Sequence, residues 1–328
     1  MNRVPLTILL LHVGFLSFGQ VITGTVLDQE TGEPVSFASL FFDGTFVGTT
    51  ADENGRFELD VSKYRSRPLH ISAMGYDPGV ITGFTRAEPF LVLLTPRVFE
   101  IEEVSVSTES LARKRKACLN IFRSEFLGRT GNARRCSILN ERDITFNYGS
   151  DQDTLRAYAS QPIRIENLAL GYEETYYLDK FEYDRKSGNL FFTGNIIFTR
   201  DLNQGDSYDK SFARRRKYAY EGSRMHFFRT LWNNDLVLSP FSVKDSSGVE
   251  LYYDQLVVKD QGGGSYLTYH RGLDIYYYSI HSYIIFLGEK AWFEEDGFFD
   301  PAALRWGGRM SLKRIADWLP YEYLLPQE

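Results

Sequence analysis

The chain has few of the residues that metal and thiol chemistry require. Its 328 residues include two cysteines and five histidines. No histidine has a Glu two or three positions after it and no HExxH occurs, so the ligand pair of a zinc peptidase is missing. A G-x-S-x-G elbow, a phosphate-binding glycine loop and a dinucleotide fingerprint are also missing. The sequence therefore predicts a non-enzyme without catalytic residues, cofactor or metal site.

Long apolar runs are also scarce, and one stands at the N-terminus. A positively charged start precedes an almost uninterrupted apolar stretch, Leu6–Phe18. This length matches the roughly 7 to 15 apolar residues of a secretion signal and falls short of the ~20 of a spanning helix. The small residues Ser17 and Gly19 predict cleavage before Gln20. We expect residues 1–19 to be a signal peptide and no transmembrane segment to remain, with an uncleaved anchor as the alternative.

An excess of positive charge is absent as well. The net charge of −6 gives no reason to expect nucleic acid or an anionic membrane as partner. With 43% hydrophobic and 24% charged residues the chain has the composition of a folded soluble protein, and 15% aromatic residues favour β structure. The mature length, at ~150 residues per domain, predicts two domains.

The two cysteines leave two alternatives open. Cys118 and Cys136 would meet an oxidising compartment in an exported protein, where such a pair can form a disulfide. Cys118 also shares the apolar stripe of a predicted helix with Phe122 and Phe126, which suits a buried thiol equally well. The spacing permits both arrangements.

Residues 20–107 alternate between short apolar strands and turn sequences, which is typical of a small all-β domain. Three turns place a glycine where a positive φ is useful: Thr31–Pro34, Asp43–Thr45 and Asp52–Gly55. Between the first two, Val35–Phe42 is apolar on both faces, which predicts a central strand. We expect a β-sandwich here.

The same segment resembles the carboxypeptidase regulatory-like domain family over nearly all of residues 20–95. The positions that agree in order and spacing are Gly24, Val26, Asp28, Thr31–Val35, Ala38, Gly44-Thr45, Gly48–Thr50, Asp52, Gly55, Phe57, Leu59, Ser72 and Gly75-Tyr76. The resemblance implies a transthyretin-like β-sandwich. In related proteins the module occurs on exported enzymes, at the front of TonB-dependent outer-membrane receptors and in stand-alone envelope proteins, and it does not imply peptidase activity.

Residues 108–328 are predicted to form a second, α+β domain dominated by an antiparallel sheet. Long aromatic segments with strong alternation, such as Tyr172–Tyr183, support the sheet. Helices are expected near residues 110–127, 223–234 and 309–318.

Local signals mark the ends of these helices. Ser110 and Ser223 are predicted N-caps, and Gly128 is predicted to end the first helix. A last strand of the sandwich is expected at Glu102–Thr108. The basic run Arg113–Lys116 is interpreted as a solvated helix face, because it covers barely one turn of an acidic chain.

Parts of the second domain resemble stand-alone envelope proteins of Gram-negative bacteria that carry the same module. The segments concerned are Cys136–Asn140, Ile163–Tyr172, Tyr220–Phe228 and Arg314–Pro320. Those proteins have no assigned activity. The resemblance therefore implies an architecture and a location, the periplasm or the outer-membrane surface, and no reaction.

Some residues outside any motif are candidates for binding sites. His226 lies among aromatic residues, where a packed, hydrogen-bonded histidine is favoured over a site residue. Glu294–Asp296 could hold calcium, but it lacks regular ligand spacing, so a solvated acidic turn is favoured. Tyr276–Tyr278 and Tyr176-Tyr177 could form a stacking platform for a glycan or a partner strand, although ordinary core and surface tyrosines are favoured. Gly262–Gly264 reads as a turn.

Taken together, these features predict a non-enzymatic exported envelope protein whose sandwich is a docking or binding module. The expected partner is another envelope or outer-membrane protein, and a glycan is the second class considered. Two alternatives remain, an enzyme with a site scattered through the second domain and a periplasmic carrier of an apolar ligand.

Overall fold

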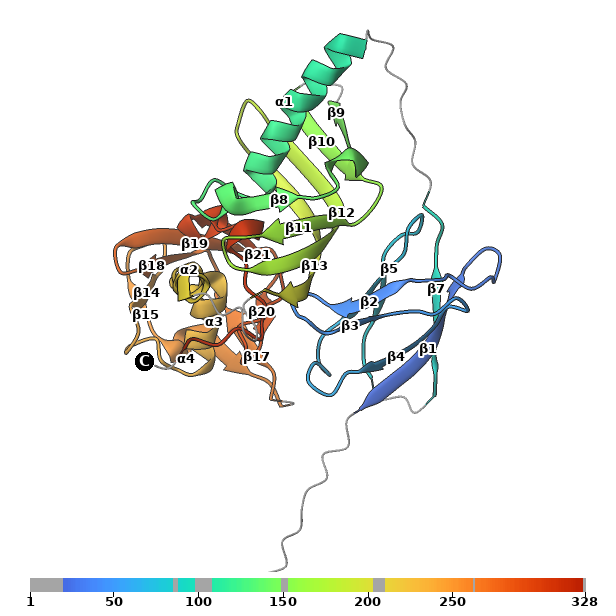
Figure 1. Ribbon diagram of the computed structural model, residues 1–328. Helices are drawn as coiled ribbons and strands as arrows, with labels where there is room; N and C mark the ends of the chain where they lie inside the picture. Colours follow the sequence, from blue (N-terminus) through green and yellow to red (C-terminus); the bar gives the residue numbers. More distant parts are fainter. Residues whose placement is uncertain are drawn as a thin grey trace, which may run out of the picture.

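The computed structural model describes residues 20–84, 88–97, 108–148, 153–202, 210–261 and 263–326. The expected signal peptide, nearly all of the strand expected at 102–108 and the first glycine of the 262–264 turn lie outside the described residues. The predicted mainly β fold is confirmed, and it packs around three hydrophobic cores. Figure 1 shows the three units, which we call the sandwich (residues 20–97, blue), the middle unit (108–202, green) and the C-terminal unit (210–326, orange to red).

The sandwich consists of two small sheets packed face to face. One sheet has the order β4-β1-β7, with β4 (Arg56–Asp60), β1 (Val21–Asp28) and β7 (Phe90–Leu94). The other has the order β3-β2-β5-β6, with β3 (Gly48–Thr50), β2 (Ser39–Phe42), β5 (Leu69–Ser72) and β6 (Gly79–Ile81). Side chains alternate between core and solvent along β1 and β4, as a half-buried strand requires.

The strand expected at Val35–Phe42 is central in its sheet but shorter than predicted. Regular structure begins at Ser39, because Phe37 has a φ of 58° and its side chain is 63% exposed. A left-handed residue cannot continue a strand, so the apolar pattern before Ser39 does not extend β2.

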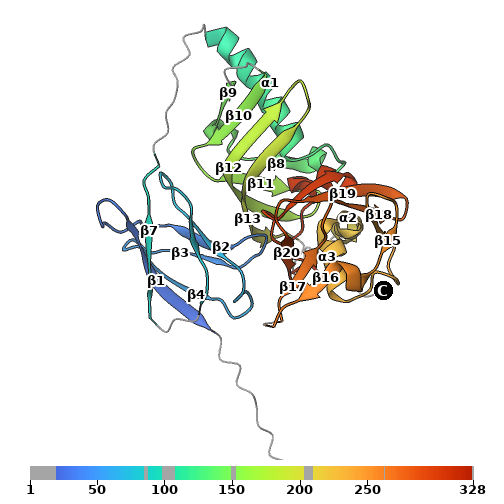
Figure 2. The same ribbon diagram turned by 180° about the vertical axis from the view of Figure 1, so that it is seen from behind.

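The middle unit is a six-stranded antiparallel sheet with one long helix across a face (Figures 1 and 2). Five strands have the order β8-β11-β12-β10-β9, and β13 pairs with the free side of β12. Their bounds are β8 (Cys136–Ile138), β11 (Ile163–Asn167), β12 (Tyr172–Asp184), β10 (Thr154–Ala159), β9 (Ile144–Tyr148) and β13 (Leu190–Asp201).

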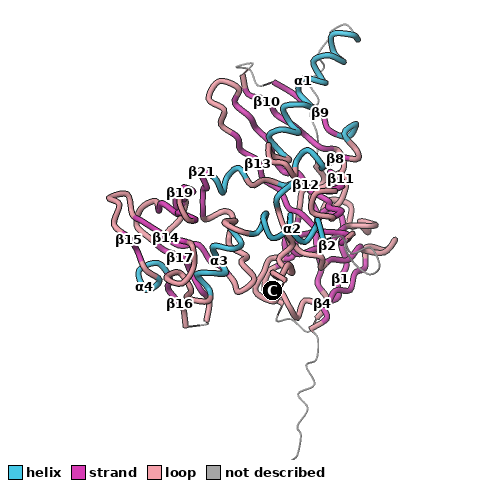
Figure 3. The backbone as a smooth tube through the Cα atoms, turned by 60° about the vertical axis from the view of Figure 1, so that its left-hand side comes forward, coloured by secondary structure: helices cyan, strands magenta, loops and turns pink. Residues whose placement is uncertain are grey.

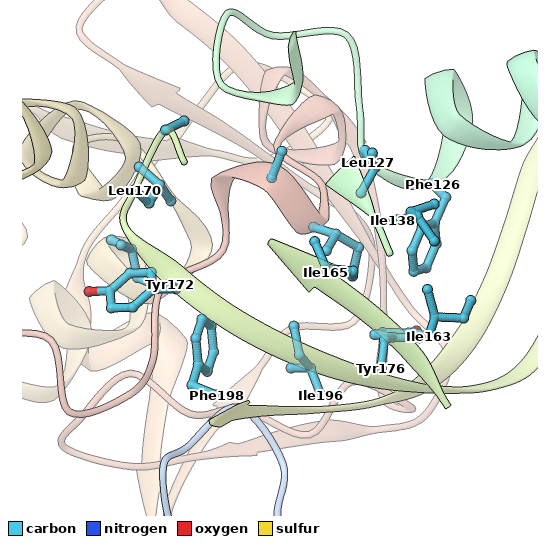
Figure 4. Packing of buried hydrophobic residues seen from close by; sticks show 14 of the residues in the cluster. Phe126, Leu127, Ile138, Ile163, Ile165, Leu170, Tyr172, Tyr176, Ile196 and Phe198 are labelled. Carbon is cyan, nitrogen blue, oxygen red and sulfur yellow. The ribbon is translucent and has the colours of Figure 1, made fainter. Parts of the chain in front are cut away.

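Helix α1 (Thr108–Phe126) covers this sheet with its apolar stripe. Of its basic run, Arg113, Lys114 and Lys116 are exposed, but Arg115 is half-buried and donates to the carbonyl oxygens of Ile144 and Glu141, each at 2.7 Å, so the expected solvated face is corrected at this residue. Phe126 packs against Tyr176 of β12 with ring centroids 5.0 Å apart, a contact visible in Figure 4. The helix stops before Gly128, whose φ of +103° suits glycine. Short 3₁₀ turns at Ala133–Arg135 and Glu141–Asp143 connect it to the sheet.

The C-terminal unit holds two further antiparallel sheets that enclose α3 (Arg224–Trp232). The five-stranded sheet contains β15 (Glu250–Leu251), β14 (Phe241–Lys244), β18 (Leu273–Tyr277), β19 (Ile280–Phe286) and β21 (Leu304–Gly308). The three-stranded sheet contains β16 (Val257–Lys259), β17 (Ser265–Thr268) and β20 (Lys290–Phe293). Figure 3 shows how the helices, in cyan, lie among these strands. No helix within the described ranges is long and apolar enough to span a bilayer.

The remaining helices are α2 (Lys210–Tyr220), α4 (Tyr253–Leu256) and α5 (Arg309–Leu312). The expected N-cap of α3 is present, since the Ser223 hydroxyl accepts the His226 N–H at 3.1 Å. Two differences from the prediction stand out. Helix α2 is not predicted from the sequence, and the stretch expected as one helix at 309–318 is α5 followed by a 3₁₀ turn, Ile315–Asp317.

Basic side chains with distant partners occur at both places. In α2, Arg216 is 7% exposed and pairs with Asp201 at 2.6 Å, and it is buried together with Ala219 and Tyr220. A mostly polar sequence therefore forms a helix that buries one charged side chain beside a short apolar face. Between α5 and the 3₁₀ turn, the backbone of Lys313 is extended, and its ammonium donates to the carbonyl oxygen of Ala219 at 2.8 Å.

Candidate functional site

The sandwich docks on the rest of the chain through one continuous surface, which we call the docking interface. The sandwich contributes the turn Asp43–Phe46 together with Tyr64 and Arg67. The other two units contribute the edge of β13, the acidic turn 294–296 and the C-terminal segment 321–322. These contacts join residues more than a hundred positions apart in the chain, so they are properties of the tertiary fold.

Backbone hydrogen bonds attach the turn to the edge of β13. Gly44 N–H donates to the carbonyl oxygen of Ile196 at 2.7 Å, and Phe198 N–H donates to the carbonyl oxygen of Thr45 at 2.9 Å. The Asp43 carboxylate accepts the N–H of Ile196 at 2.7 Å. Figure 4 shows Ile196 and Phe198 on β13 with the blue turn of the sandwich against that strand. The sandwich therefore covers a sheet edge that would otherwise present unpaired backbone groups.

Glycine is required at position 44 of this turn. Its φ is +71°, and a Cβ there would lie 2.5 Å from the Tyr321 ring. The carbonyl oxygen of Gly44 in turn accepts the N–H of Tyr321 at 2.9 Å. The close approach of two backbones fixes the C-terminal segment on the sandwich.

Glu322 adds a side-chain contact to the same place. Its Oε1 accepts the Tyr64 hydroxyl at 2.8 Å and the Phe46 N–H at 3.1 Å. One carboxylate thus satisfies two donors of the sandwich.

Arg67 is the buried charge of the docking interface. Its side chain is 2% exposed, and its Nε lies 2.6 Å from Glu294 Oε2 while its Nη2 pairs with Asp296. Aromatic rings enclose the guanidinium, whose central carbon lies 4.2 Å from the ring centroid of Phe298 and 4.9 Å from that of Tyr321. The two carboxylates and the two ring faces balance the charge of a cation that is removed from water, while its Nη1 has no hydrogen-bond partner among the described residues.

Burial alters the acid groups of the docking interface. It raises the pKa of Asp43 to about 6, although the Ile196 N–H and the Arg67 charge act in the opposite direction. Burial also raises the pKa of Glu294, and Arg67 again opposes the effect. Both carboxyl groups therefore depend on the docked arrangement for their partners.

A small cavity of about 130 Å³ lies behind the turn, where the three units meet. Its walls are mainly apolar, with the charged side chains of Asp43, Arg224 and Lys313 among them. Burial lowers the pKa of Arg224 to about 10, and its Nε has no hydrogen-bond partner among the described residues. The volume is well below the ~300 Å³ at which ligand pockets begin, so this cavity does not favour the carrier alternative.

His226 is a packed, hydrogen-bonded histidine, as the sequence analysis favours. Its Nδ1 accepts the N–H of Gly222 at 3.2 Å, and its ring stacks on Tyr220 at 4.6 Å. Burial lowers its pKa to about 4, with the positive charges of Lys313 and Arg229 acting in the same direction.

The acidic turn 294–296 is neither a calcium site nor a solvated turn. Glu294 and Asp296 face the sandwich and hold Arg67, so both sequence interpretations are corrected. Within the described ranges, no group of three or more His, Cys, Asp and Glu side chains is arranged to hold a metal ion. Sequence reasoning misses Arg67 because nothing local distinguishes it from Arg65 two residues earlier.

The tyrosines do not share one exposed surface, because Tyr176, Tyr177 and Tyr277 pack against buried or neighbouring rings in different units. Tyr176 is 1% exposed in the middle unit, and Tyr177 stacks on Phe41 of the sandwich at 4.6 Å. In the C-terminal unit Tyr277 packs on Phe241 at 4.9 Å, and Tyr278 is 71% exposed.

The two cysteines, both among the described residues, are not joined in a disulfide. Cys118 is buried in α1, and the Cys136 thiol lies 3.5 Å from the carbonyl oxygen of Asn132. The structure thus corresponds to the second of the two alternatives, that of separate thiols.

Comparison with solved structures gives weak similarities only. A 9R-lipoxygenase from Cyanothece PCC8801 is 14% identical, with a TM-score of 0.17. The alignment covers 65% of this chain and 48% of the lipoxygenase, so this chain spans less than half of that protein. A Bacteroides fragilis NCTC 9343 protein, described as membrane-associated and of unknown function, is 12% identical, with coverages of 88% and 92% and a TM-score of 0.19. These TM-scores carry no argument. No curated protein matches.

A family comparison agrees with the fold of the N-terminal unit. Residues 22–106 match the model of the CarboxypepD_reg-like domain. The matched segment covers the strands β1 to β7 described above, apart from Val21 at the start of β1. The chain therefore carries a CarboxypepD_reg-like domain, which forms its N-terminal β-sandwich.

Proposed function

We propose that this chain is a non-enzymatic, exported envelope protein in which the sandwich docks a partner protein. The composition of residues 1–19 supports export. The docking interface indicates which surface of the sandwich is free for a partner. The face that carries the turn Asp43–Phe46 is already covered by the rest of the chain. A partner must then use the opposite sheet, β4-β1-β7.

The outer face of that sheet is apolar at its β7 edge, and this observation carries the proposal. Leu91 is 65% exposed and Leu93 is 52% exposed, while Val92 between them is buried. Among the described residues, β7 pairs in its sheet with β1 and ends the strand order. An edge strand with aliphatic side chains on its open face suits the addition of a strand from another protein.

The chemistry of this face favours a protein over a glycan as the partner. Leu91 and Leu93 offer aliphatic surface and no hydrogen-bonding side-chain groups. A strand can use the edge N–H and C=O groups of β7 together with this surface, whereas a sugar needs polar side chains beside its ring. The proposed occupant is therefore an edge strand of another envelope protein.

The test is affinity capture of partners from a detergent-solubilised envelope with the tagged mature chain. We expect a stoichiometric partner that the wild type retains and that a Leu91→Glu/Leu93→Glu variant loses. Leu238→Glu is the matched control, since Leu238 is 87% exposed but lies in the C-terminal unit. The proposal fails if the wild type retains no partner or if both variants retain it equally, and thermal unfolding confirms that all three proteins are folded.

A further inference from the structure

A large cleft lies between the middle and C-terminal units, away from the docking interface. Its volume is about 680 Å³, within the range of ~300 to 1,000 Å³ that is usual for small-molecule sites. The end of α1, the β12–β13 hairpin, the end of α2 and the segment 309–317 form its walls. The sandwich contributes no lining residue among those described.

Positive charge exceeds negative charge along these walls. The cations are Arg129, Arg309, Lys313 and Arg314, and the acids are Glu125 and Asp317. Glu125 is shared, because Arg314 Nη1 lies 2.7 Å from its Oε2 and Arg129 pairs with its Oε1. A single carboxylate therefore balances two guanidinium groups.

One of the four cations is available to a ligand. The Lys313 ammonium is committed, since it donates to the carbonyl oxygens of Tyr218, Ala219 and Glu221. Arg129 is 70% exposed, but its Nη2 pairs with Glu125 and its Nε donates to the Ser124 hydroxyl at 3.1 Å, so it adds positive charge beside the cleft. Arg309 is exposed at the start of α5 and has no hydrogen bond or ion pair with any described residue. Guanidinium groups of this kind bind carboxylate and phosphate oxygens in pairs.

Asp317 also lines the cleft, but its side chain is occupied within the protein. It is 7% exposed, and its Oδ1 accepts the Asn132 amide at 2.8 Å. Hydrogen bonds from Asn132 and Thr130 oppose the rise in the pKa of Asp317 that burial causes. Asp317 therefore adds a buried acid to the wall and not an open contact for a ligand.

Aromatic surface completes the cleft. Tyr218 and Tyr183 both line it, and the Tyr218 side chain is 68% exposed. An exposed tyrosine ring beside polar groups matches the apolar face of a sugar ring.

From the positive charge and the aromatic surface of this cleft we propose that it binds a sugar that carries a negatively charged group. Its acid oxygens contact Arg309 beside the charge of Arg129, and the ring packs on Tyr218. The acid is a carboxylate, as in glucuronate, or a phosphate, as in glucose 6-phosphate. Both share the chemistry that the arginines recognise, and the experiment separates them.

The test is isothermal titration of the full mature chain at constant ionic strength. The probes are glucuronate and glucose 6-phosphate, with glucose as the uncharged ring and inorganic phosphate as the charge without a ring. We expect one of the two charged sugars to bind and both simpler probes to bind at least about tenfold more weakly. Arg309→Gln should weaken that binding by about tenfold or more.

Arg305→Gln is the matched control, because Arg305 is an exposed arginine on β21 that does not line the cleft. It should bind the sugar as the wild type does. The proposal is overturned if neither charged sugar binds, if inorganic phosphate binds as tightly as the sugar, or if Arg309→Gln leaves the affinity unchanged. These outcomes are independent of the strand-docking proposal, which concerns β7.

Discussion

The backbone N–H of Gly44 donates to the carbonyl oxygen of Ile196 at 2.7 Å, and this bond joins a turn of the sandwich to the edge of the middle unit. The next residue, Thr45, forms an isolated parallel bridge with Ile197. Exposed sheet edges are common sites of contact between chains, and here one such edge is covered within the chain. Stability of the whole protein should then depend on the turn.

Gly44→Ala should loosen the docking interface. The alanine must adopt a φ near +71°, and its Cβ would meet the Tyr321 ring at 2.5 Å. Gly32→Ala is the matched control, since Gly32 has a φ of +73° and a Cβ added there would have no atom within 4 Å. Backbone strain should lower the free energy of unfolding of both variants by about 1–2 kcal/mol. For Gly44→Ala, urea unfolding should show a further decrease of roughly 1–3 kcal/mol, because the hydrogen bonds of Gly44 are displaced. An equal decrease in the two variants would contradict the close packing of Gly44 on Tyr321.

Arg67→Met should be among the most destabilising single changes in the sandwich. Removal of the cation leaves Glu294 and Asp296 without their partner at a buried surface, which typically costs about 3–5 kcal/mol. In the control Arg56→Met, the lost pair with Asp52 is solvent-exposed and contributes at most about 1 kcal/mol. Urea unfolding of the two variants checks the difference. A cost below about 1 kcal/mol for Arg67→Met would show that the buried pair contributes little.

Local chemistry explains why the sandwich could be predicted from sequence. In its turns the signals are short-range: Asp52 accepts the N–H of Asn54 at 2.8 Å, and Gly55 has a φ of +71°. Residues only a few positions apart determine such turns. The same holds for the cap of α3, where Ser223 and His226 are three residues apart.

The docking interface and the cleft could not be predicted, because their partners are distant in sequence. Arg67 and Glu294 are 227 positions apart, and Arg314 and Glu125 are 189 positions apart. Each charged residue in isolation resembles an ordinary solvated one. Only the fold shows that the acidic turn at 294–296 has a buried arginine as its partner.

Cys118 and Cys136 should both be reduced thiols in the purified protein. Burial raises the pKa of Cys136, and the negative charges of Glu174 and Asp317 add to the effect, so its thiolate is disfavoured. Thiol oxidation proceeds through the thiolate. Alkylation in denaturant without reductant should therefore add two adducts by mass spectrometry, the same number as with reductant. No adducts without reductant and two with it would establish a disulfide instead.

Glu174 should make the stability of the protein depend on pH. Its side chain is 2% exposed in the core of the middle unit, Oε1 accepts the Asn167 amide at 3.1 Å, and burial raises its pKa to about 8. Because the folded pKa lies above the unfolded value, the folded state holds the proton more tightly. The protonated Glu174 therefore contributes on the order of a few kcal/mol to the free energy of unfolding. This contribution is fully present below about pH 4.5 and is lost as the pH rises through about 8.

Glu174→Gln keeps the acceptor for Asn167 and removes the ionisation. The free energy of unfolding of this variant, measured in urea from pH 5 to pH 9, should fall less steeply than that of the wild type and exceed it at the alkaline end. Glu173→Gln is the control, since this neighbour on β12 is 38% exposed and pairs with Arg200 at the surface. It should keep the wild-type pH dependence. Parallel curves for wild type and Glu174→Gln would mean that the buried carboxyl does not titrate in this range.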